Sequence, residues 1–459
     1  MVMLMQLKNK IKSYTILYIK ILILLLILIP KKFGTIFDVL PLRLILLSIL
    51  PIIFSIEYKL KKIELNKFKL KYLFIFYSIF IIFTLISLFI TKNIPVTIYS
   101  ILKFIVFGID FAIICKIKFE KNDLLDIIKC FIISILIVSL YGIWQYIKYI
   151  DLNYNGTEKY FGIRGRIIST FFNPIYYGIF INLVFIFLLF IRQKKIINSK
   201  IFNIILLLLP IILYFTLVLT FTRSTLLVFW GIIFLILISN YKIIINKITI
   251  ITFIICLSFH FIVPGAIYVA KSTVYYGLDM LHITDLYQII VNDKNANILG
   301  DDGNKAIYED DSSVEHRKDF ADIGIKIAND NAITGVGLGS YIDYMYSEDF
   351  DKAYPKYNKI KDYPHAGFIM LSAETGYIST AFFIISLCTI IVTFVKNFYT
   401  NFKEKNIIYK LSSLSLSVFI GLFITTIVSE NPIYDTQLFP LFLILMGLNL
   451  NYMHKNKAS

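Results

Sequence analysis

Long apolar runs alternate with short polar segments along the whole chain. Each run holds roughly twenty residues, which is the length that a helix needs to cross the hydrocarbon core of a bilayer. The centres of the runs lie near residues 22, 45, 81, 106, 138, 182, 211, 232, 256, 380, 420 and 443. The pattern therefore predicts an all-α polytopic membrane protein with about 12 transmembrane helices.

One polar interruption is much longer than the others. It covers residues 266–365, between the ninth and tenth runs. Its first part, NDKNANILGDDGNKAIYEDDSSVEHRKD, is acidic and rich in Gly, Asn and Asp, which is typical of a mobile surface loop. From Phe320 onward the pattern predicts a short helix, a Gly-rich turn at GVGLGS and a second amphipathic helix. The chain is then divided into N-terminal helices in 1–150, central helices with Arg-bearing loops in 151–265, the large loop in 266–365, and C-terminal helices in 366–459.

Basic residues indicate which side of the membrane each loop occupies. They concentrate on alternate loops, which we assign to the cytoplasm because loops rich in Lys and Arg are retained there. These segments are 57–71, 116–121, 192–200, 240–247, 396–405 and the tail 454–457. With about twelve spans, both termini are then cytoplasmic and the large loop between spans 9 and 10 is extracytoplasmic.

Composition agrees with this picture. The chain is 58% hydrophobic, and its mean hydropathy is +0.75. The net charge of +16 is explained by the cytoplasmic loops and by a lysine surplus spread over loops and runs alike, so we expect no nucleic-acid partner. The four cysteines lack CxxC spacing and predict neither a disulfide framework nor a zinc site. The first run, 14–30, follows a basic start without a small-residue cleavage site, which favours a retained anchor over a signal peptide.

Three arginines stand beside run ends on the predicted extracytoplasmic side. Arg223 lies in LTFTRSTLLVFW, at a tight turn where the positive-inside rule does not expect an arginine. Arg164 and Arg166 precede Asn173 and Pro174, a pair that suits a helix start. Snorkelling or solvated arginines are the simple alternative. Paired guanidinium groups at a helix entrance also make an anion site, because each binds phosphate in a bidentate fork.

The segment SVEHRKDF places His316 and Arg317 ahead of the predicted short helix. A solvated helix face is the simple interpretation of such a run. The downstream GVGLGS lacks the Lys-Ser/Thr pair of a P-loop and a preceding parallel strand, so nucleotide binding is not expected there. Its glycines instead indicate a sharp turn with close backbone approach.

The segment DYPHAGFIMLSAETGY places His365 where the large loop meets the next run. Pro364 suits the first position of a helix, and His365, Ser372 and Gly376 would then share a stripe that faces protein. An interfacial hydrogen-bonding histidine is the alternative. The ordinary pKa of histidine also suits a general base near neutral pH.

These polar groups come from distant segments but share one predicted side of the membrane. They are Arg164, Arg166, Arg223, Arg317 and His365. Their coincidence predicts an anion-binding cleft at the outer leaflet with a base beside it. Arginines without interleaved carboxylates suit a lipid diphosphate, whereas a metal site would need converging Asp, Glu or His. We expect no metal or cofactor; for the acidic segments DDGN and EDD, a solvated loop is the simpler interpretation than a cation site.

The ordered motifs resemble the O-antigen ligase and Wzy-type polymerase family. The motifs are TFTRST with Arg223, HRKDF to GVGLGS with Arg317, and YPHAGFIMLSAETGY with His365. RIISTFFNPIYYGIF is similar to that family's GTF-NPN segment, and the likeness covers residues 160–385. The chain departs from the family pattern at Ala366, where an Asn is frequent, and at Ser224, where a Gly is frequent.

The resemblance implies a GT-C-type, metal-independent, inverting glycosyl transfer on the outer face of the bacterial cytoplasmic membrane. The donor would be an undecaprenyl-diphosphate-linked glycan. Arg223 and Arg317 would stabilise the leaving diphosphate, and His365 would accept the proton of the attacking hydroxyl. Arg164, Arg166 and His316 would assist substrate binding. The acceptor stays open: a glycan for a polymerase, a lipid core for a ligase, or a protein for an oligosaccharyltransferase.

Two other classes of function compete with this interpretation. A lipid-linked glycan flippase or other transporter would carry charges along its mid-membrane segments, whereas the runs here hold few besides Asp38, Arg43 and Asp110, which we place near run ends. The chain also lacks the internal repeats of many transporters. In a structural scaffold the outer arginines would be incidental. The sequence therefore favours the transferase.

Overall fold

The structure is a computed structural model of the whole chain. It describes residues 13–30, 35–37, 40–60, 63–65, 71–152, 158–160, 163–171, 173–193, 197, 199–244, 247–263, 311–357, 362–403, 407–428 and 431–458. Residues 266–310 and 358–361 of the predicted large loop, which include the DDGN segment, lie outside these residues, as does Asp38.

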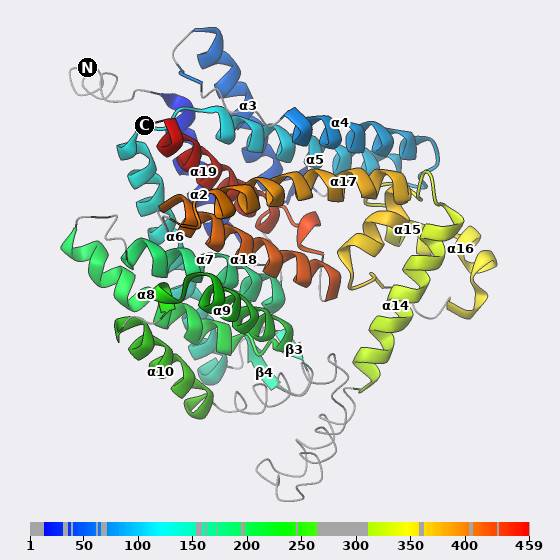
Figure 1. The fold of residues 1–459 in the computed structure, drawn as a ribbon. Coiled ribbons are helices and arrows are strands. Elements are labelled where there is room, and N and C mark those ends of the chain that lie inside the picture. The colour runs from blue at the N-terminus through cyan, green and yellow to red at the C-terminus, as the bar shows by residue number, and fades with distance from the viewer. Residues whose placement is uncertain are drawn as a thin grey trace, which may run out of the picture. The chain divides into compact units, whose positions relative to one another are not determined.

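Long helices form most of the described structure (Figure 1). They are α2 (Tyr14–Leu28), α3 (Leu42–Lys59), α4 (Lys71–Ile86), α5 (Ile94–Lys116), α6 (Lys121–Leu152), α7 (Pro174–Gln193), α8 (Lys200–Leu219), α9 (Arg223–Ile244), α10 (Lys247–Ile262), α17 (Gly367–Thr400), α18 (Ile407–Val428) and α19 (Leu438–Ala458). Every predicted run centre falls inside one of them. Among the described residues, 7 helices are long and apolar enough to cross a membrane. The prediction of a helical membrane protein is confirmed, while the count of about twelve spans stays a prediction.

Shorter elements connect these helices. They are the helices α14 (Asp311–Asp330), α15 (Tyr341–Met345) and α16 (Glu348–Ala353), the 3-10 turns η2 (Ser87–Phe89), η3 (Pro355–Tyr357) and η4 (Pro432–Tyr434), and the strands β1 (Thr35–Phe37), β2 (Leu40–Pro41), β3 (Glu158–Tyr160) and β4 (Ile163–Arg166). The strands form two antiparallel pairs, β1 with β2 and β3 with β4. The sequence pattern missed these hairpins because strands of two to four residues carry almost no alternation signal.

Local capping signals explain where several helices begin. The Asn173 side chain accepts a hydrogen bond from the Tyr176 amide at 2.8 Å, and α7 starts at Pro174. Asn93 caps α5 in the same way, through the Val96 amide at 3.3 Å. Both starts follow from the preference of Asn for the N-cap and of Pro for the first turn. The predicted helix start at Asn173–Pro174 is therefore confirmed.

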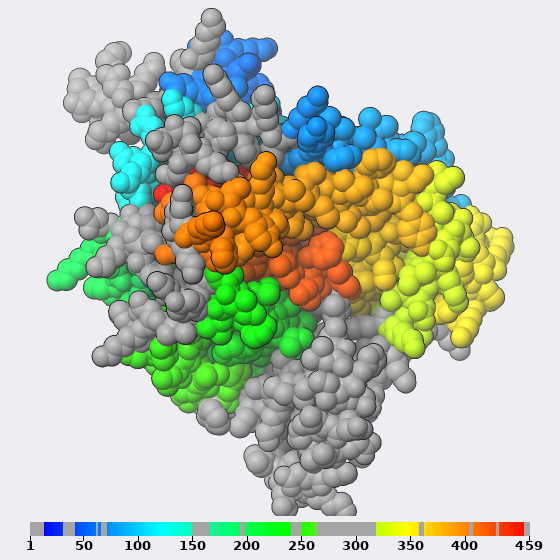
Figure 2. All heavy atoms as spheres, in the orientation of Figure 1, coloured from blue at the N-terminus to red at the C-terminus, as the bar shows by residue number. Residues whose placement is uncertain are grey.

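The chain forms two compact units. Unit 1 comprises Met1–Ile135, Ala321–Leu416 and Asn431–Ser459, and unit 2 comprises Leu136–Phe320 and Ser417–Glu430. Within unit 1, α17 packs along α4, and α5 packs against α3 and α19. Figure 2 shows α4 and α17 side by side on one face. Within unit 2, α7 packs against α8 and α9 and is almost entirely buried.

Candidate functional site

Arg166 is a buried side chain that holds the turn between α8 and α9. Its residue is 7% exposed; Nε donates to the Thr220 carbonyl oxygen at 2.9 Å, and a terminal guanidinium nitrogen donates to Thr222 Oγ1 at 3.1 Å. The next amide, of Ile167, donates to the Leu219 carbonyl oxygen at 3.2 Å. The end of β4 is thus attached to the TFTRST turn. The structure brings Arg166 to the segment that carries Arg223, and gives it a structural task that the sequence did not predict.

Arg223 is the first residue of α9 and is half-buried. The turn before it is sharp, because Phe221 has a φ of 48°. A cation at this position does not stabilise the helix, since the N-terminal end of a helix dipole is itself positive. The same end favours anions, which a guanidinium can bind alongside the first amides. The place of Arg223 therefore suits an anion ligand better than it suits the helix.

The structure places the other predicted basic residues on secondary structure. Arg164 is in β4, two residues before Arg166. His316 and Arg317 are inside α14, which begins at Asp311, so the prediction that they precede a short helix is wrong. The acidic residues before them were interpreted as loop because they are polar, yet Asp and Ser favour the first turn of a helix. The side chains of Arg164, His316 and Arg317 lie outside the described part of the chain.

His365 lies in a short loop before α17 and is half-buried. The helix begins at Gly367 with Ala366 as its N-cap, so the prediction that Pro364 occupies the first helical position is wrong. Pro364 is buried, and its carbonyl oxygen accepts a hydrogen bond from Asn431 Nδ2 at 3.4 Å. These tertiary contacts of Pro364 prevail over its local preference for the helix. The hydrogen bond from Asn431 thereby holds the loop that carries His365.

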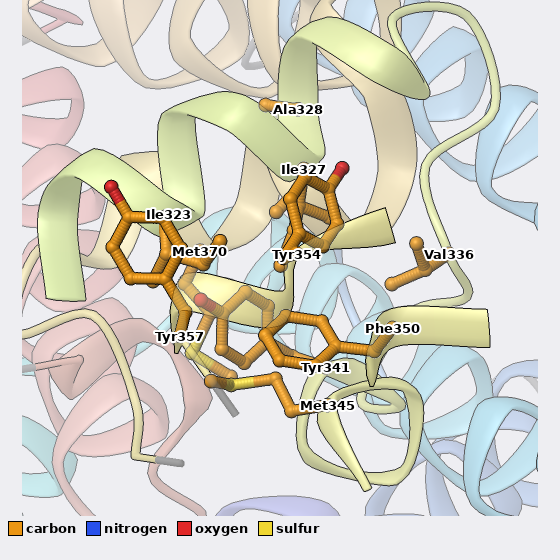
Figure 3. Close-up of a cluster of buried hydrophobic side chains, with 11 residues drawn as sticks. Ile323, Ile327, Ala328, Val336, Tyr341, Met345, Phe350, Tyr354, Tyr357 and Met370 are labelled. Atoms are coloured by element: carbon orange, nitrogen blue, oxygen red, sulfur yellow. The ribbon is translucent and has the colours of Figure 1, made fainter. Parts of the chain in front are cut away.

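Helix α14 holds the same loop from another side. A Cβ on Gly324 would lie 2.8 Å from the Ile369 side chain and 3.3 Å from the Pro364 ring, so α14 approaches this loop as closely as a glycine allows. Ile323 and Ile327 of α14 join Met370 of α17 in a buried apolar cluster, together with Tyr341, Met345, Phe350, Tyr354 and Tyr357 (Figure 3). The extended predicted loop therefore ends in a packed subdomain, and α17 contributes to its core.

Helix α17 is broken at Gly376, which has φ 80° and ψ 166°. This contradicts the predicted stripe in which Gly376 continued the helical face of His365. The amide of Tyr377 is paired outside the helix, with the Ala332 carbonyl oxygen at 2.8 Å. A Cβ on Gly376 would lie 2.4 Å from the Ile333 carbonyl oxygen. Only glycine meets both the positive φ and the close approach.

The GVGLGS turn fits against this break, backbone to backbone. The Val336 amide donates to the Ala373 carbonyl oxygen at 3.0 Å, and the Gly337 amide donates to the Glu374 carbonyl oxygen at 2.9 Å. On its other side the turn contacts α5 and the residues before it: Ser340 Oγ is 2.9 Å from Thr91 Oγ1 and from Thr97 Oγ1. The interpretation of these glycines as a turn with close backbone approach is confirmed.

Glu374 is a fully buried carboxylate that the sequence analysis did not select. Its Oε1 accepts a hydrogen bond from the Tyr341 amide at 3.2 Å, and its Oε2 accepts one from the Tyr434 hydroxyl at 2.6 Å. Lys103 Nζ donates to the Tyr434 carbonyl oxygen at 3.1 Å, which brings a positive charge to the same cluster. A single Glu and a single Lys inside apolar runs were the signals that could have identified this pair.

The apolar helices and the polar loops at their ends define a multi-span helical membrane protein. Residues 205–384 match the family described as O-antigen ligase, which confirms the predicted resemblance. The matched range begins in α8 and ends in α17, and so includes Arg223, Arg317 and His365. Arg164 and Arg166 lie outside it. No curated protein matches the chain.

Proposed function

We propose that the chain is a membrane glycosyltransferase of the O-antigen ligase type, which polymerises or ligates an undecaprenyl-diphosphate-linked oligosaccharide on the outer face of the bacterial cytoplasmic membrane. The observation that carries the proposal is the family match, because its range includes Arg223, Arg317 and His365 in order. A lipid-linked glycan donor and a bilayer setting follow from that family. The extracytoplasmic side of the site and the cytoplasmic termini follow from the charges of the loops.

Arg223 would bind the diphosphate of the donor. A planar guanidinium binds phosphate oxygens in pairs, and the N-terminus of α9 adds amide donors. As the bond to the sugar breaks, the diphosphate gains negative charge. Fixed positive groups therefore stabilise the transition state more than the ground state. Arg166 would support this role indirectly, since its hydrogen bonds to Thr220 and Thr222 hold the turn that precedes Arg223. Arg164 remains proposed as a further ligand.

Arg317 would act on the same diphosphate from α14. It precedes Gly324 by seven residues, and positions seven apart share one face of a helix. Gly324 is the residue of α14 that packs on Pro364 beside His365. The proposal gives Arg317 and His365 a common substrate, with His316 as a further binding group.

His365 would accept the proton of the acceptor hydroxyl. The acceptor oxygen forms a bond to the anomeric carbon while the carbon–oxygen bond to the diphosphate breaks, and the electron pair leaves with the diphosphate. The hydroxyl proton passes to the imidazole. A single displacement of this kind inverts the anomeric carbon, and the arginines compensate the charge of the leaving group without a metal. The same step serves a glycan, a lipid-core or a protein acceptor.

Purified protein and donor in detergent test the proposal without any membrane gradient. We expect a new glycosidic bond, detected by mass spectrometry of the product, which also distinguishes a transferase from a flippase. His365→Ala should lower kcat by about 10²–10⁴-fold, and Arg223→Ala by about 10²–10³-fold. Lys318→Ala, at an exposed neighbour of Arg317, is the matched control and should behave as wild type. Wild-type product from both active-site variants would refute the proposal.

A further inference from the structure

Tyr363 is an exposed aromatic residue two positions before His365. It is 43% exposed, in contrast to Tyr341, which is 0% exposed in the apolar cluster formed with Ile323 and Met370. The two rings are stacked, with centroids 6.5 Å apart and planes inclined by 23°. Tyr341 lies toward one face of the Tyr363 ring, while part of the Tyr363 side chain is open to solvent. The structure thus presents a flat apolar surface next to the proposed base.

Three acidic residues act electrostatically on Tyr363. Burial raises the pKa of Tyr363, and the charges of Glu374, Asp343 and Asp362 raise it further. A raised pKa keeps the phenol protonated at neutral pH, so that it can donate a hydrogen bond. Asp343 is half-buried and Asp362 is exposed, so both carboxylates are open to further hydrogen bonds.

The Tyr341 hydroxyl adds a second polar group on this side. It is buried and has no hydrogen-bond partner among the described residues. Burial raises the pKa of Tyr341, and Glu374 and Asp362 add to the effect, so this hydroxyl also stays protonated.

The chain between Tyr363 and His365 fixes the distance between them. Two residues of extended chain span at most about 7 Å. The intervening Pro364 is buried, and its contacts with Asn431 and with Gly324 of α14 hold the segment in place. A sugar ring stacked on Tyr363 would therefore lie next to the loop that carries His365.

We propose that Tyr363, with Asp343 and Asp362, forms the binding platform for the acceptor sugar, and that this sugar is a neutral, hydroxyl-rich pyranose; the assignment rests on the proposed function. A pyranose offers an apolar C–H face to an aromatic ring, whose face is electronegative, and hydroxyl groups to carboxylate acceptors. Carboxylates repel an acidic sugar and the donor diphosphate. The carboxylates thus favour a neutral sugar over an acidic one.

Binding of small glycosides tests the platform independently of catalysis. The probes are methyl glycosides of neutral hexoses, N-acetylhexosamines and hexuronic acids, measured by saturation-transfer NMR on the purified protein. We expect the neutral probes to bind and the hexuronic acids to bind at least about fivefold more weakly. Tyr363→Ala should weaken binding about tenfold, whereas Tyr363→Trp should retain it. Tyr346→Ala is the matched control, because Tyr346 is 64% exposed on the same subdomain.

Transfer kinetics separate this inference from the proposed function. Tyr363→Ala should raise the KM for the acceptor and leave kcat at saturating acceptor near the wild-type value, whereas His365→Ala should lose kcat and still bind the glycosides. Asp362→Asn should improve binding of hexuronic acids. Unchanged glycoside binding and unchanged acceptor KM in Tyr363→Ala would overturn the platform while the transferase stands. Tyr363-dependent glycoside binding without any transfer product would refute the transferase and leave a sugar-binding platform.

Discussion

Two polar motifs of this protein are held in place by different means. In unit 2 the TFTRST turn is held by a side chain, since the Arg166 guanidinium reaches the Thr220 carbonyl oxygen and the Thr222 hydroxyl. In unit 1 the GVGLGS turn is held by main chain, through hydrogen bonds from Val336 and Gly337 to α17. The first motif can be weakened one hydrogen bond at a time. The second has no room for a side chain, so a single added atom should disrupt it.

Gly335→Ala should have the largest effect, because it adds a Cβ to the main-chain contact. Gly335 has a φ of 64°, and its Cβ would lie 2.1 Å from the Glu374 carbonyl carbon. We expect a loss of about 3 kcal/mol in the free energy of unfolding, measured by equilibrium unfolding in detergent. The control is Gly231→Ala in α9, where a Cβ meets nothing within 4 Å, and where stability should rise by about 1 kcal/mol. Equal effects in the two variants would contradict the backbone-to-backbone contact.

Glu374 allows the contact between the GVGLGS turn and α17 to be tested through a buried side chain. Glu374→Ala leaves the Tyr341 amide and the Tyr434 hydroxyl without their acceptor. We expect a loss of about 3 kcal/mol of stability for Ala and about 1 kcal/mol for Gln, which keeps an acceptor oxygen. The rate of limited proteolysis in the 321–357 subdomain should follow the same order, with the Ala variant cleaved faster than the Gln variant. A Gln variant as unstable as the Ala variant would show that charge, and not hydrogen bonding, is what matters there.

Arg166 tests the motif that is held by a side chain. Arg166→Gln removes both hydrogen bonds to the turn and should lower stability by about 2 kcal/mol. Thr222→Val removes one of these two, together with the hydrogen bond from Thr222 Oγ1 to the Thr220 carbonyl oxygen, and should cost about 1 kcal/mol. If Arg166 only positions Arg223, both variants should reduce kcat in proportion to their loss of stability. A rise in donor KM without any loss of stability would instead assign Arg166 to direct substrate binding, as its sequence position alone predicted.

The smallest effect is expected at the edge of the main-chain motif, where Lys92 and Asp349 form an exposed ion pair. The hydrogen bond to Lys92 lowers the pKa of Asp349, and the hydrogen bond to Asp349 raises the pKa of Lys92. The stability that the pair gains through Asp349 is thus present above the unfolded-state pKa of Asp349, and it is lost as the pH falls through the lowered folded-state pKa. The stability that the pair gains through Lys92 is present below the unfolded-state pKa of Lys92, and it is lost as the pH rises through the raised folded-state pKa.

Thermal unfolding across pH checks this pair. The Tm of Lys92→Ala should match that of wild type in acid and differ from it by a small amount near neutral pH, and high salt should remove the difference. Lys118→Ala, at the similarly exposed pair of Lys118 with Glu64, is the control for a pair outside the motif. A difference that persists in high salt would indicate that Lys92 does more than form a surface pair.

The sequence predicted well those features that depend on neighbouring residues. Helices follow the apolar runs, and the Asn173–Pro174 start of α7 depends on one cap and one ring. The failures depend on contacts with distant segments. Pro364 is outside the helix because it packs on α14, and Gly376 breaks α17 because the Tyr377 amide pairs with Ala332. No local pattern reveals such partners.

The residues of the candidate site also fall into two groups, those that the sequence indicates and those that only the fold reveals. Residue types and loop charges selected Arg223, Arg317 and His365, since these are chemical signals that a sequence displays. The burial of Arg166, the carboxylate of Glu374 and the exposed ring of Tyr363 escaped selection. Each is one of many similar residues in the chain until the fold gives it a partner. The sequence therefore selects candidate reacting groups by their chemistry, whereas the residues that position them are found only through the fold.

The break at Gly376 also determines how much of α17 is needed to cross a bilayer. An unbroken helix of 34 residues would be about 51 Å long, far more than the roughly 30 Å of hydrocarbon. Residues 377–400 alone extend about 36 Å, which is enough to span it. The turns before the break are then not needed to span the bilayer, and Met370 and Ala373 in them pack in the apolar cluster of the 321–357 subdomain. Gly376 thus divides α17 into a segment long enough to span a bilayer and a shorter segment next to the loop that carries His365.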